Sequence, residues 1–214
     1  MNSYELIEQA ADLISQARRE TALTGAGIST PSGVPDFRSP RSGLWANVDV
    51  MAIASASSFR RQPKVFYDWL RPLLETVLQA GPNAAHVALS EMERDGNLTT
   101  LVTQNIDLLH SRAGSRNVLE IHGHLRDMVC LACHFTTAAE PYFRDFLAEG
   151  KVPYCPRCHH VLKPAVVLFG DLLPQRALKD SEKAARSSDV MLVAGTSLEV
   201  DPAGSLPLSS GIES

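Results

Sequence analysis

The 214-residue sequence predicts an α/β fold in which helices cover both faces of a parallel sheet. Helix-like segments alternate with short strand-like segments, which is the order that a parallel sheet requires. Most strand-like segments are unbroken apolar runs, as expected for strands that are buried on both sides. Polar clusters follow these runs, at the edge where open α/β sheets bind their ligands.

The expected elements are placed by apolar periodicity and by the residues that start and stop them. Apolar residues recur at helical spacing over residues 3–19, where Ser3 is a suitable N-cap. Pro63 can open a later helix, and Gly81 with Pro82 ends it. Strands are expected over residues 21–24, 98–103, 118–121, 165–169 and 190–194, and helices over 3–19, in pieces between 43 and 80, and over 84–94, 105–113, 141–149 and 174–187.

Five polar clusters follow the expected strands: residues 25–38, residues 104–107, His122, residues 170–171 and residues 195–197. Because the carboxyl ends of parallel strands share one edge of a sheet, these clusters are expected to meet. A single site that uses all five is a simpler explanation than five unrelated loops.

The first cluster combines a glycine turn with a charged, aromatic end. Gly25 and Gly27 carry no Cβ, so the backbone can turn tightly and approach a ligand, and exposed N–H groups in such a turn can hold a phosphate. Residues 36–38, Asp-Phe-Arg, add a ring for a flat base and a guanidinium for phosphate. Thr30 stands where a strict dinucleotide fingerprint has its third glycine, so an ordinary strand-to-helix turn remains the alternative.

The four cysteines form two C-x-x-C pairs, Cys130 with Cys133 and Cys155 with Cys158, separated by 21 residues. In a reducing compartment this spacing favours four thiolates around a structural Zn²⁺. A ribbon of this size has almost no core, so the metal would supply its folding free energy. A redox dithiol or two disulfides remain the alternatives.

The composition is that of a globular protein, with 44% hydrophobic and 21% charged residues. A formal net charge of -4 and the lack of a long basic run argue against nucleic-acid binding. The N-terminus lacks the pattern of a secretory signal, and no apolar stretch approaches the roughly 20 residues that span a bilayer. We therefore expect no membrane association and a cytoplasmic protein.

The motifs, taken in order, resemble those of the sirtuin family over nearly the whole chain. They are Gly25-Ala-Gly-Ile-Ser29, Pro35-Asp-Phe-Arg38, Thr103-Gln-Asn-Ile-Asp107, His122-Gly123, the two C-x-x-C pairs and Gly195-Thr-Ser197. The resemblance implies a bacterial NAD-dependent protein deacetylase with a Rossmann-like large domain and a small domain. Residues 1–38, 86–125 and 164–214 would form the NAD-binding domain, and residues 39–85 and 126–163 the helical module and zinc ribbon.

The resemblance also implies roles for individual residues. His122 would be the general base that deprotonates a ribose hydroxyl, a task suited to imidazole. Asn105 and Asp107 would orient the ribose and hold the nicotinamide amide. Taken alone, a single histidine is more often a surface or core residue, and Asn or Asp after a strand often caps a helix. The residues implied to bind NAD are Gly25, Ala26, Gly27, Thr30, Phe37, Arg38, Gln104, Asn105, Ile106, Asp107, His122, Gly195, Thr196 and Ser197.

A substrate segment follows from the same resemblance. Val166, Val167, Leu168, Phe169 and Gly170 resemble the family's peptide-binding strand, to which the backbone of an acetylated protein would add as a further strand. A buried strand of the sheet is the alternative for part of this segment.

The acyl preference is expected to be for neutral acetyl-lysine. Sirtuins that favour succinyl-lysine carry Tyr-x-x-Arg, whereas Tyr67 is followed at that spacing by Leu70. Arg71 lies one position late, about 100° around a helix, and would point elsewhere.

One departure from the family concerns the C-terminal part. Family members continue beyond residues 199–208 with further strands, whereas this chain stops at Ser214. We expect weaker NAD binding, lower stability and an exposed sheet edge that could self-associate. A catalytically impaired NAD- and acetyl-peptide-binding module, and a mono-ADP-ribosyltransferase, are the alternative functions.

Overall fold

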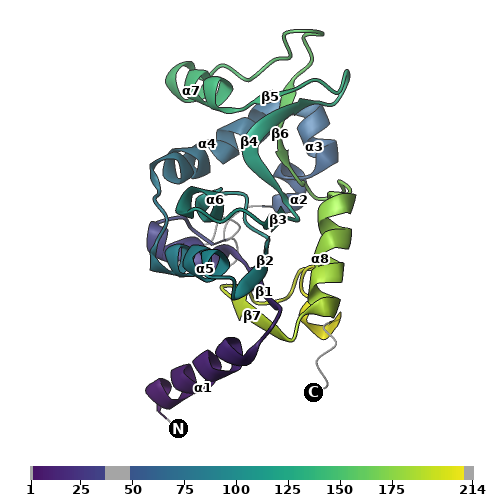
Figure 1. Cartoon of the computed structure of the whole chain (residues 1–214). Coiled ribbons are helices and arrows are strands. Elements are labelled where there is room, and N and C mark those ends of the chain that lie inside the picture. Colours follow the sequence, from purple (N-terminus) through teal and green to yellow (C-terminus); the bar gives the residue numbers. More distant parts are fainter. Residues whose placement is uncertain (1, 37–48, 210–214) are drawn as a thin grey trace.

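Two sheets organise the computed structural model, which describes residues 2–36 and 49–209 (Figure 1). The larger sheet has four parallel strands in the order β3-β2-β1-β7. The smaller sheet has three antiparallel strands in the order β5-β4-β6. Helices α5 and α6 lie on one side of the larger sheet and α8 on the other (Figure 1). The predicted fold class is therefore confirmed.

The central strand of the larger sheet is β1 (Glu20–Thr24), and all five of its residues are buried. It pairs with β2 (Leu98–Thr103) on one side and with β7 (Val190–Ala194) on the other. The short strand β3 (Val118–Glu120) completes the sheet beside β2. Since the strands are parallel, their carboxyl ends lie at one edge.

Successive residues of β1 face the two helical layers, because side chains alternate across a strand. Ala22 joins an apolar core under α5 (Ala84–Arg94), and Leu23 joins a second core under α8 (Gln175–Ser187). The short helix α6 (Leu109–Ala113) packs beside α5. This double cover explains why the strand sequences are continuous apolar runs.

Within residues 49–80 the chain forms helices in pieces, as predicted. The 3₁₀-helix η1 (Ala26–Ser32) follows β1, and α2 (Val50–Ile53), α3 (Ala56–Arg61) and α4 (Pro63–Gln79) follow in turn. Residues 43–48 of the expected helical region lie outside the described residues. A last 3₁₀-helix, η2 (Pro207–Ser209), ends the described chain.

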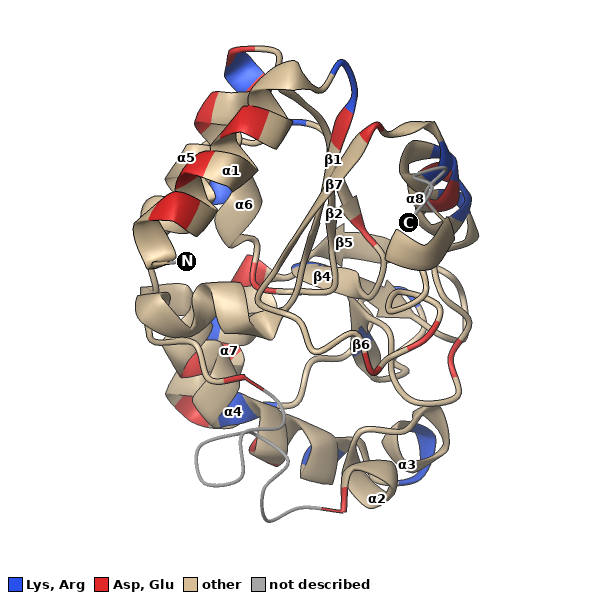
Figure 2. Cartoon of the chain, turned by 90° about the horizontal axis from the view of Figure 1, so that it is seen from below, with Lys and Arg blue, Asp and Glu red and all other residues tan. Residues whose placement is uncertain are grey.

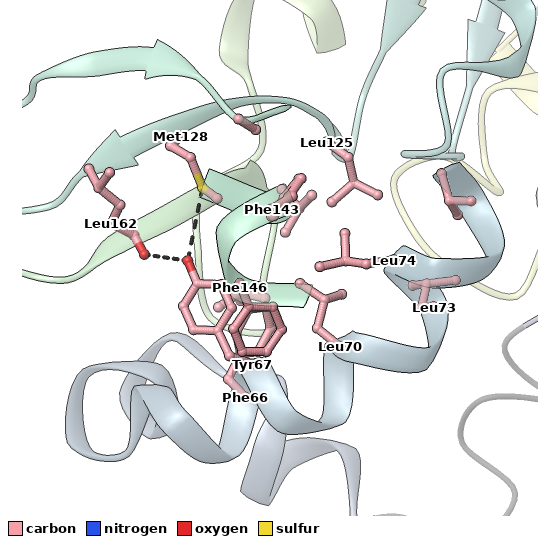
Figure 3. Close-up of a cluster of buried hydrophobic side chains, with 14 of the residues drawn as sticks. Phe66, Tyr67, Leu70, Leu73, Leu74, Leu125, Met128, Phe143, Phe146 and Leu162 are labelled. Atoms are coloured by element: carbon pink, nitrogen blue, oxygen red, sulfur yellow. Dashed lines mark hydrogen bonds between the residues drawn. The ribbon is translucent and has the colours of Figure 1, made fainter. Parts of the chain in front are cut away.

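A third apolar core joins α4 to the smaller sheet and to α7 (Figure 3). The smaller sheet consists of β4 (Gly123–Cys130), β5 (Thr136–Ala138) and β6 (Leu162–Val166), and α7 spans Glu140–Glu149. The hydroxyl group of Tyr67 donates to the Leu162 carbonyl at 2.6 Å and lies 3.9 Å from the Met128 sulfur. The aromatic side chains of Phe66 and Tyr67 on α4 are therefore part of this core.

The strand expected over residues 165–169 is displaced. β6 starts at Leu162 and pairs antiparallel with β4, so it does not join the parallel sheet. The expected strand began at residue 165 and so left out Lys163, a residue type that is rarely buried without a partner. In the structure Lys163 is buried, and its Nζ donates to the Val166 carbonyl at 2.5 Å and to Asp171 at 2.9 Å.

The first helix, α1 (Ser3–Gln16), is shorter and less buried than expected. Asn2, not Ser3, is its N-cap, and the Glu5 side chain completes a capping box with the Asn2 backbone. None of its residues is buried, and Ile7 on its apolar face is 65% exposed. α1 projects away from the parallel sheet (Figure 1).

Charged residues gather on the outer helices α1, α5 and α8 (Figure 2). Over residues 2–36 and 49–209, the helices are all too short or too polar to span a bilayer.

Glu20 is a carboxylate inside the sheet layer, with 0% of its surface exposed. Among the described residues, neither of its carboxylate oxygens has a hydrogen-bond partner. Burial raises the pKa of Glu20, because desolvation penalises the charged form. The folded state therefore binds this proton more tightly than the unfolded chain does. The resulting stability is fully present below the unfolded pKa of about 4.3 and is lost as pH rises through the folded pKa.

We predict that Glu20→Gln raises Tm at pH 8 by about 2–4 °C, equivalent to about 1 kcal/mol, because it removes a buried charge. At pH 4.5 the gain should shrink, since the parent carboxyl group is then protonated. Scanning calorimetry at both pH values measures this, with Glu8→Gln on the exposed face of α1 as the control. A gain that is the same at both pH values would contradict the assignment.

Candidate active site

The carboxyl ends of all four parallel strands open into one cleft of about 850 Å³. Walls from α4 and from the segment after β6 close its other side. The cleft is lined by most residues that the sequence singled out: Gly25, Ala26, Gly27, Gln104, Asn105, Ile106, His122, Val166, Val167, Leu168, Phe169, Gly170, Gly195, Thr196 and Ser197.

The turns after β1 and β7 are in direct contact. The Gly27 N–H donates to the Gly195 carbonyl at 2.8 Å. A Cβ on Gly27 would lie 2.9 Å from the Gly195 oxygen, and a Cβ on Gly25 would lie 2.7 Å from the Thr196 Cβ. Gly195 itself has a φ of 68°, which side chains rarely tolerate. These glycines are therefore required first for packing one turn against the other.

His122 lies directly after β3, with its ring at the cleft. Its Nδ1 is 3.1 Å from the Gln104 carbonyl oxygen, which can only accept a hydrogen bond. Nδ1 must then carry the proton, and the neutral ring keeps a lone pair on Nε2. Burial lowers the pKa of His122, and the bond to Gln104 partly opposes this shift. The geometry therefore favours a neutral imidazole that can accept a proton.

Asn105 is oriented by two donor bonds from its side chain. Its Nδ2 donates to the Gly25 carbonyl at 3.1 Å and to the Ser29 hydroxyl at 3.1 Å. Its buried Oδ1 has no hydrogen-bond partner among the described residues. This orphaned acceptor at the cleft fits a ligand that carries N–H or O–H groups.

Asp107 lies behind the cleft wall and does not line it. One carboxylate oxygen accepts from the Ser29 hydroxyl at 2.6 Å, and the other accepts from the Leu109 N–H at 2.9 Å. Asp107 thus combines the helix-capping role that its position suggested with support of the Asn105 network.

Three further residues of the expected binding set lie away from the cleft lining or outside the described residues. Thr30 is exposed and donates to the Gly27 carbonyl at 2.9 Å, away from the cleft lining. Phe37 and Arg38 lie outside the described residues.

Sequence reasoning missed His86, which is 0% exposed on the apolar side of α5. The Asn83 N–H donates to its Nδ1 at 3.3 Å, so Nε2 carries the proton and donates to the Ser29 hydroxyl at 3.4 Å. Burial lowers the pKa of His86, while Asp107 raises it. The available signal was a lone polar residue at an apolar position of an otherwise regular helix.

The substrate segment after β6 is already held by hydrogen bonds. The Val167 N–H donates to the His122 carbonyl at 2.9 Å, and the Leu168 N–H donates to Asp171 at 3.2 Å. Phe169 exchanges two bonds with the start of α3, giving a parallel bridge to Ser55. Only part of the segment therefore continues a strand.

The four cysteines form one cluster at the end of the smaller sheet. Their sulfur atoms lie within 4.8 Å of one another, and all four are free thiols. A tetrahedral Zn²⁺ with Zn–S bonds of about 2.3 Å needs sulfur atoms about 3.8 Å apart, close to the 3.6 Å between Cys133 and Cys155. The neighbouring His134, His159 and His160 are exposed. The thiols are therefore positioned to bind a structural zinc ion.

Comparison with known proteins identifies the family to which the chain belongs. A model of the Sir2 family matches residues 25–202, which include every part of the cleft and both cysteine pairs. The chain belongs to the Sir2 family. It is 43% identical over 202 residues to NAD-dependent protein deacylase 2 of Archaeoglobus fulgidus, covering 94% of this chain and 79% of that relative. It is also 43% identical over 207 residues to NAD-dependent protein deacetylase 2 of Caldanaerobacter subterraneus subsp. tengcongensis, covering 97% and 82%.

Solved Sir2 structures share the fold. One, described as "Structural Basis for the Mechanism and Regulation of Sir2 Enzymes", has a TM-score of 0.88 at 42% identity and covers 96% of this chain and 82% of that one. Another, described as "Sir2-p53 peptide-NAD+", has a TM-score of 0.85 at 39% identity and covers 95% and 81%. The sirtuin resemblance of the sequence motifs is therefore confirmed.

Proposed function

We propose that the chain is an NAD-dependent protein-lysine deacetylase that releases nicotinamide and O-acetyl-ADP-ribose. The observation that carries the proposal is the imidazole of His122, which lies at the cleft with Nδ1–H bound to Gln104 and Nε2 left to accept a proton. Relatives that are 43% identical are named NAD-dependent deacylases and deacetylases, which supports the same activity.

NAD would lie along the edge where the parallel strands end. The two glycine turns would accommodate its phosphates closely, and Gln104 would join them at the ribose, since its Nε2 donates to Thr196 at 2.9 Å. The orphaned Oδ1 of Asn105 would accept a hydrogen bond from the nicotinamide amide or the ribose. Ile106 would pack against the nicotinamide. Thr30, Phe37, Arg38 and Asp107 stay in the proposed binding set through the family resemblance.

The chain's own residues would perform three tasks. When bound, NAD supplies an electrophilic ribose carbon with nicotinamide as its leaving group. The apolar wall of the cleft would exclude water and orient the acyl-lysine. His122 Nε2 would accept the proton of a ribose hydroxyl, and its lowered pKa keeps the ring neutral for this purpose at pH 7.

The acetylated peptide would bind beside residues 166–170. Because the N–H groups of Val167, Leu168 and Phe169 already donate within the chain, strand addition would rely on carbonyl groups of the segment. The Val167 carbonyl is the group that we propose accepts from the substrate.

The acyl end of the cleft favours a neutral acetyl group. Tyr67 donates to the Leu162 carbonyl, and Arg71 donates to the carbonyls of Phe146 and Leu147 at 2.9 Å each, so both are occupied in the core. Leu70 lines the cleft instead. A carboxylate on the acyl group would find no cation from α4 there.

The proposal includes a division of the chain into two domains. Residues 1–38, 86–125 and 164–214 would bind NAD, and residues 39–85 and 126–163 would form the small domain. Separate apolar cores under the two sheets support this, and hydrogen exchange that protected both parts equally would count against it. A cytoplasmic location is part of the same proposal, since free zinc-binding thiols persist in a reducing compartment.

The central prediction concerns an acetyl-lysine peptide incubated with NAD and the protein. Nicotinamide and deacetylated peptide should form in equal amounts, measured by chromatography and mass spectrometry. His122→Ala should lower kcat by about 10²–10⁴-fold, because it removes the proton acceptor. His160→Ala, at the exposed end of the ribbon, is the control and should keep the parent rate.

Other outcomes of this assay would contradict the proposal. Binding without turnover would indicate an NAD- and acetyl-peptide-binding module, and label transferred to protein would indicate a mono-ADP-ribosyltransferase. A succinylated version of the same peptide should react more slowly than the acetylated one, and the reverse order would overturn the acyl preference.

A second copy of this chain is the second partner that we propose. Among the described strands, β7 pairs only with β1, and the apolar face of α1 is exposed. The segment that joins α1 to the sheet lies next to the start of β7, where the Arg18 N–H donates to Asp189 at 2.9 Å. A second copy, related by two-fold symmetry, would cover both surfaces at once.

Analytical ultracentrifugation tests this surface. The average mass should rise toward a dimer with concentration, and Leu13→Glu should keep the chain monomeric by charging the apolar face. Ser15→Glu adds the same charge about 160° around the helix from Leu13, on the polar face, and should leave the dimer intact. A parent chain that stays monomeric at every concentration would refute the proposal.

A further inference from the structure

A row of buried polar side chains lies behind the wall of the cleft. Thr24, Thr103 and His110 are 0%, 2% and 2% exposed, and none of them lines the cleft. They come from β1, β2 and α6. Polar groups this deeply buried cost free energy unless they are hydrogen-bonded, so their bonds must be well determined.

The direction of each hydrogen bond in this row can be derived. The Thr24 hydroxyl donates to the Thr103 hydroxyl at 2.9 Å, which uses its single proton. The His110 Nε2, also 2.9 Å from the Thr24 hydroxyl, must then be the donor. His110 Nε2 therefore carries a proton. Burial and the neighbouring His86 lower the pKa of His110 to about 3, which keeps the ring neutral with Nδ1 unprotonated.

The row ends on the peptide group between Gln104 and Asn105. The Thr103 hydroxyl accepts from the Asn105 N–H at 3.1 Å. The carbonyl of the same peptide group is the Gln104 oxygen that accepts from His122 Nδ1 at 3.1 Å. A peptide group is planar and rigid, so a rotation that breaks one of these bonds displaces the other. The buried row and the His122 imidazole are thus hydrogen-bonded to opposite sides of one rigid peptide group.

We infer that His110 is a positioning residue for His122, acting through Thr24, Thr103 and the peptide group between Gln104 and Asn105. This inference rests on the proposed function, in which His122 is the base. The row fixes the plane of the peptide, and the carbonyl of that peptide holds the Nδ1–H tautomer that leaves Nε2 free. A base whose far nitrogen is oriented by a third group is a general device of imidazole catalysis.

The first test measures the tautomer directly. Ring ¹⁵N chemical shifts distinguish Nδ1–H from Nε2–H, and His122→Gln assigns the signal among the seven histidines. The parent should show His122 as the Nδ1–H form without any NAD present. Thr24→Val, which keeps the shape and removes the hydroxyl, should populate the Nε2–H form. Thr24→Ser keeps the hydroxyl and should match the parent.

The second test measures catalysis with the same pair of variants. Thr24→Val should lower kcat about 10–100-fold, the usual cost of a misplaced supporting group, whereas Thr24→Ser should stay within about threefold. The hydrogen bond from His122 Nδ1 to the Gln104 carbonyl raises the pKa of His122. Because Thr24→Val should weaken this bond, the acid limb of its pH–rate profile should move to lower pH. The other titratable groups lining the cleft, Asp36, Asp171, Glu199 and Asp201, are unchanged in both variants. His86 beside His110 and Asp107 near His86 are unchanged as well.

Thr103→Val and His110→Phe extend the comparison along the row. Both should reproduce the tautomer change. Each double variant with Thr24→Val should have a kcat no lower than that of the single variants, because the row acts as a unit. A His122 that keeps the parent tautomer and pH profile in all three variants, even with a lower Tm, would overturn the inference and leave a merely structural role. A parent chain with the Nδ1–H signature but no deacetylation would instead refute the proposed function.

Discussion

The close contact between the turn after β1 and the turn after β7 determines where every other part of the site lies. Gly27 donates to the Gly195 carbonyl at 2.8 Å, and a Cβ on Gly195 would lie only 2.2 Å from the Ile28 nitrogen. Side-chain atoms cannot enter such a contact, so the two turns close on each other by backbone alone. The Asn105 amide then binds the Gly25 carbonyl, and Gln104 binds Thr196 across the same junction.

Much of this arrangement follows from the sequence. The unbroken apolar runs predicted a parallel sheet covered on both faces, and parallel strands bring residues as distant as Gly25 and Gly195 to one edge. The two C-x-x-C pairs predicted the cysteine cluster. The late position of Arg71 predicted that it would point away from the acyl site.

Other features depend on partners that no local pattern contains. The expected strand left out Lys163, whose partner Asp171 is brought to it only by the fold. The apolar periodicity of α1 indicates a helix but does not say what covers its face. Asp107 does not line the cleft, because it lies behind Asn105 and supports it through Ser29. The type of a residue suggests its chemistry, but whether the residue lines the cleft or lies behind it depends on the packing.

The central claim is that contact between the two glycine turns shapes a site for NAD. Isothermal titration of NAD into Gly27→Ala, compared with Gly81→Ala, tests it most directly. A Cβ on Gly27 would meet the Gly195 backbone, whereas a Cβ on Gly81 meets nothing within 4 Å. We predict that NAD binds Gly81→Ala with the affinity of the parent. Gly27→Ala should bind NAD about tenfold or more weakly, which corresponds to roughly 1.4 kcal/mol of overpacking. Equal affinity in all three proteins would contradict it.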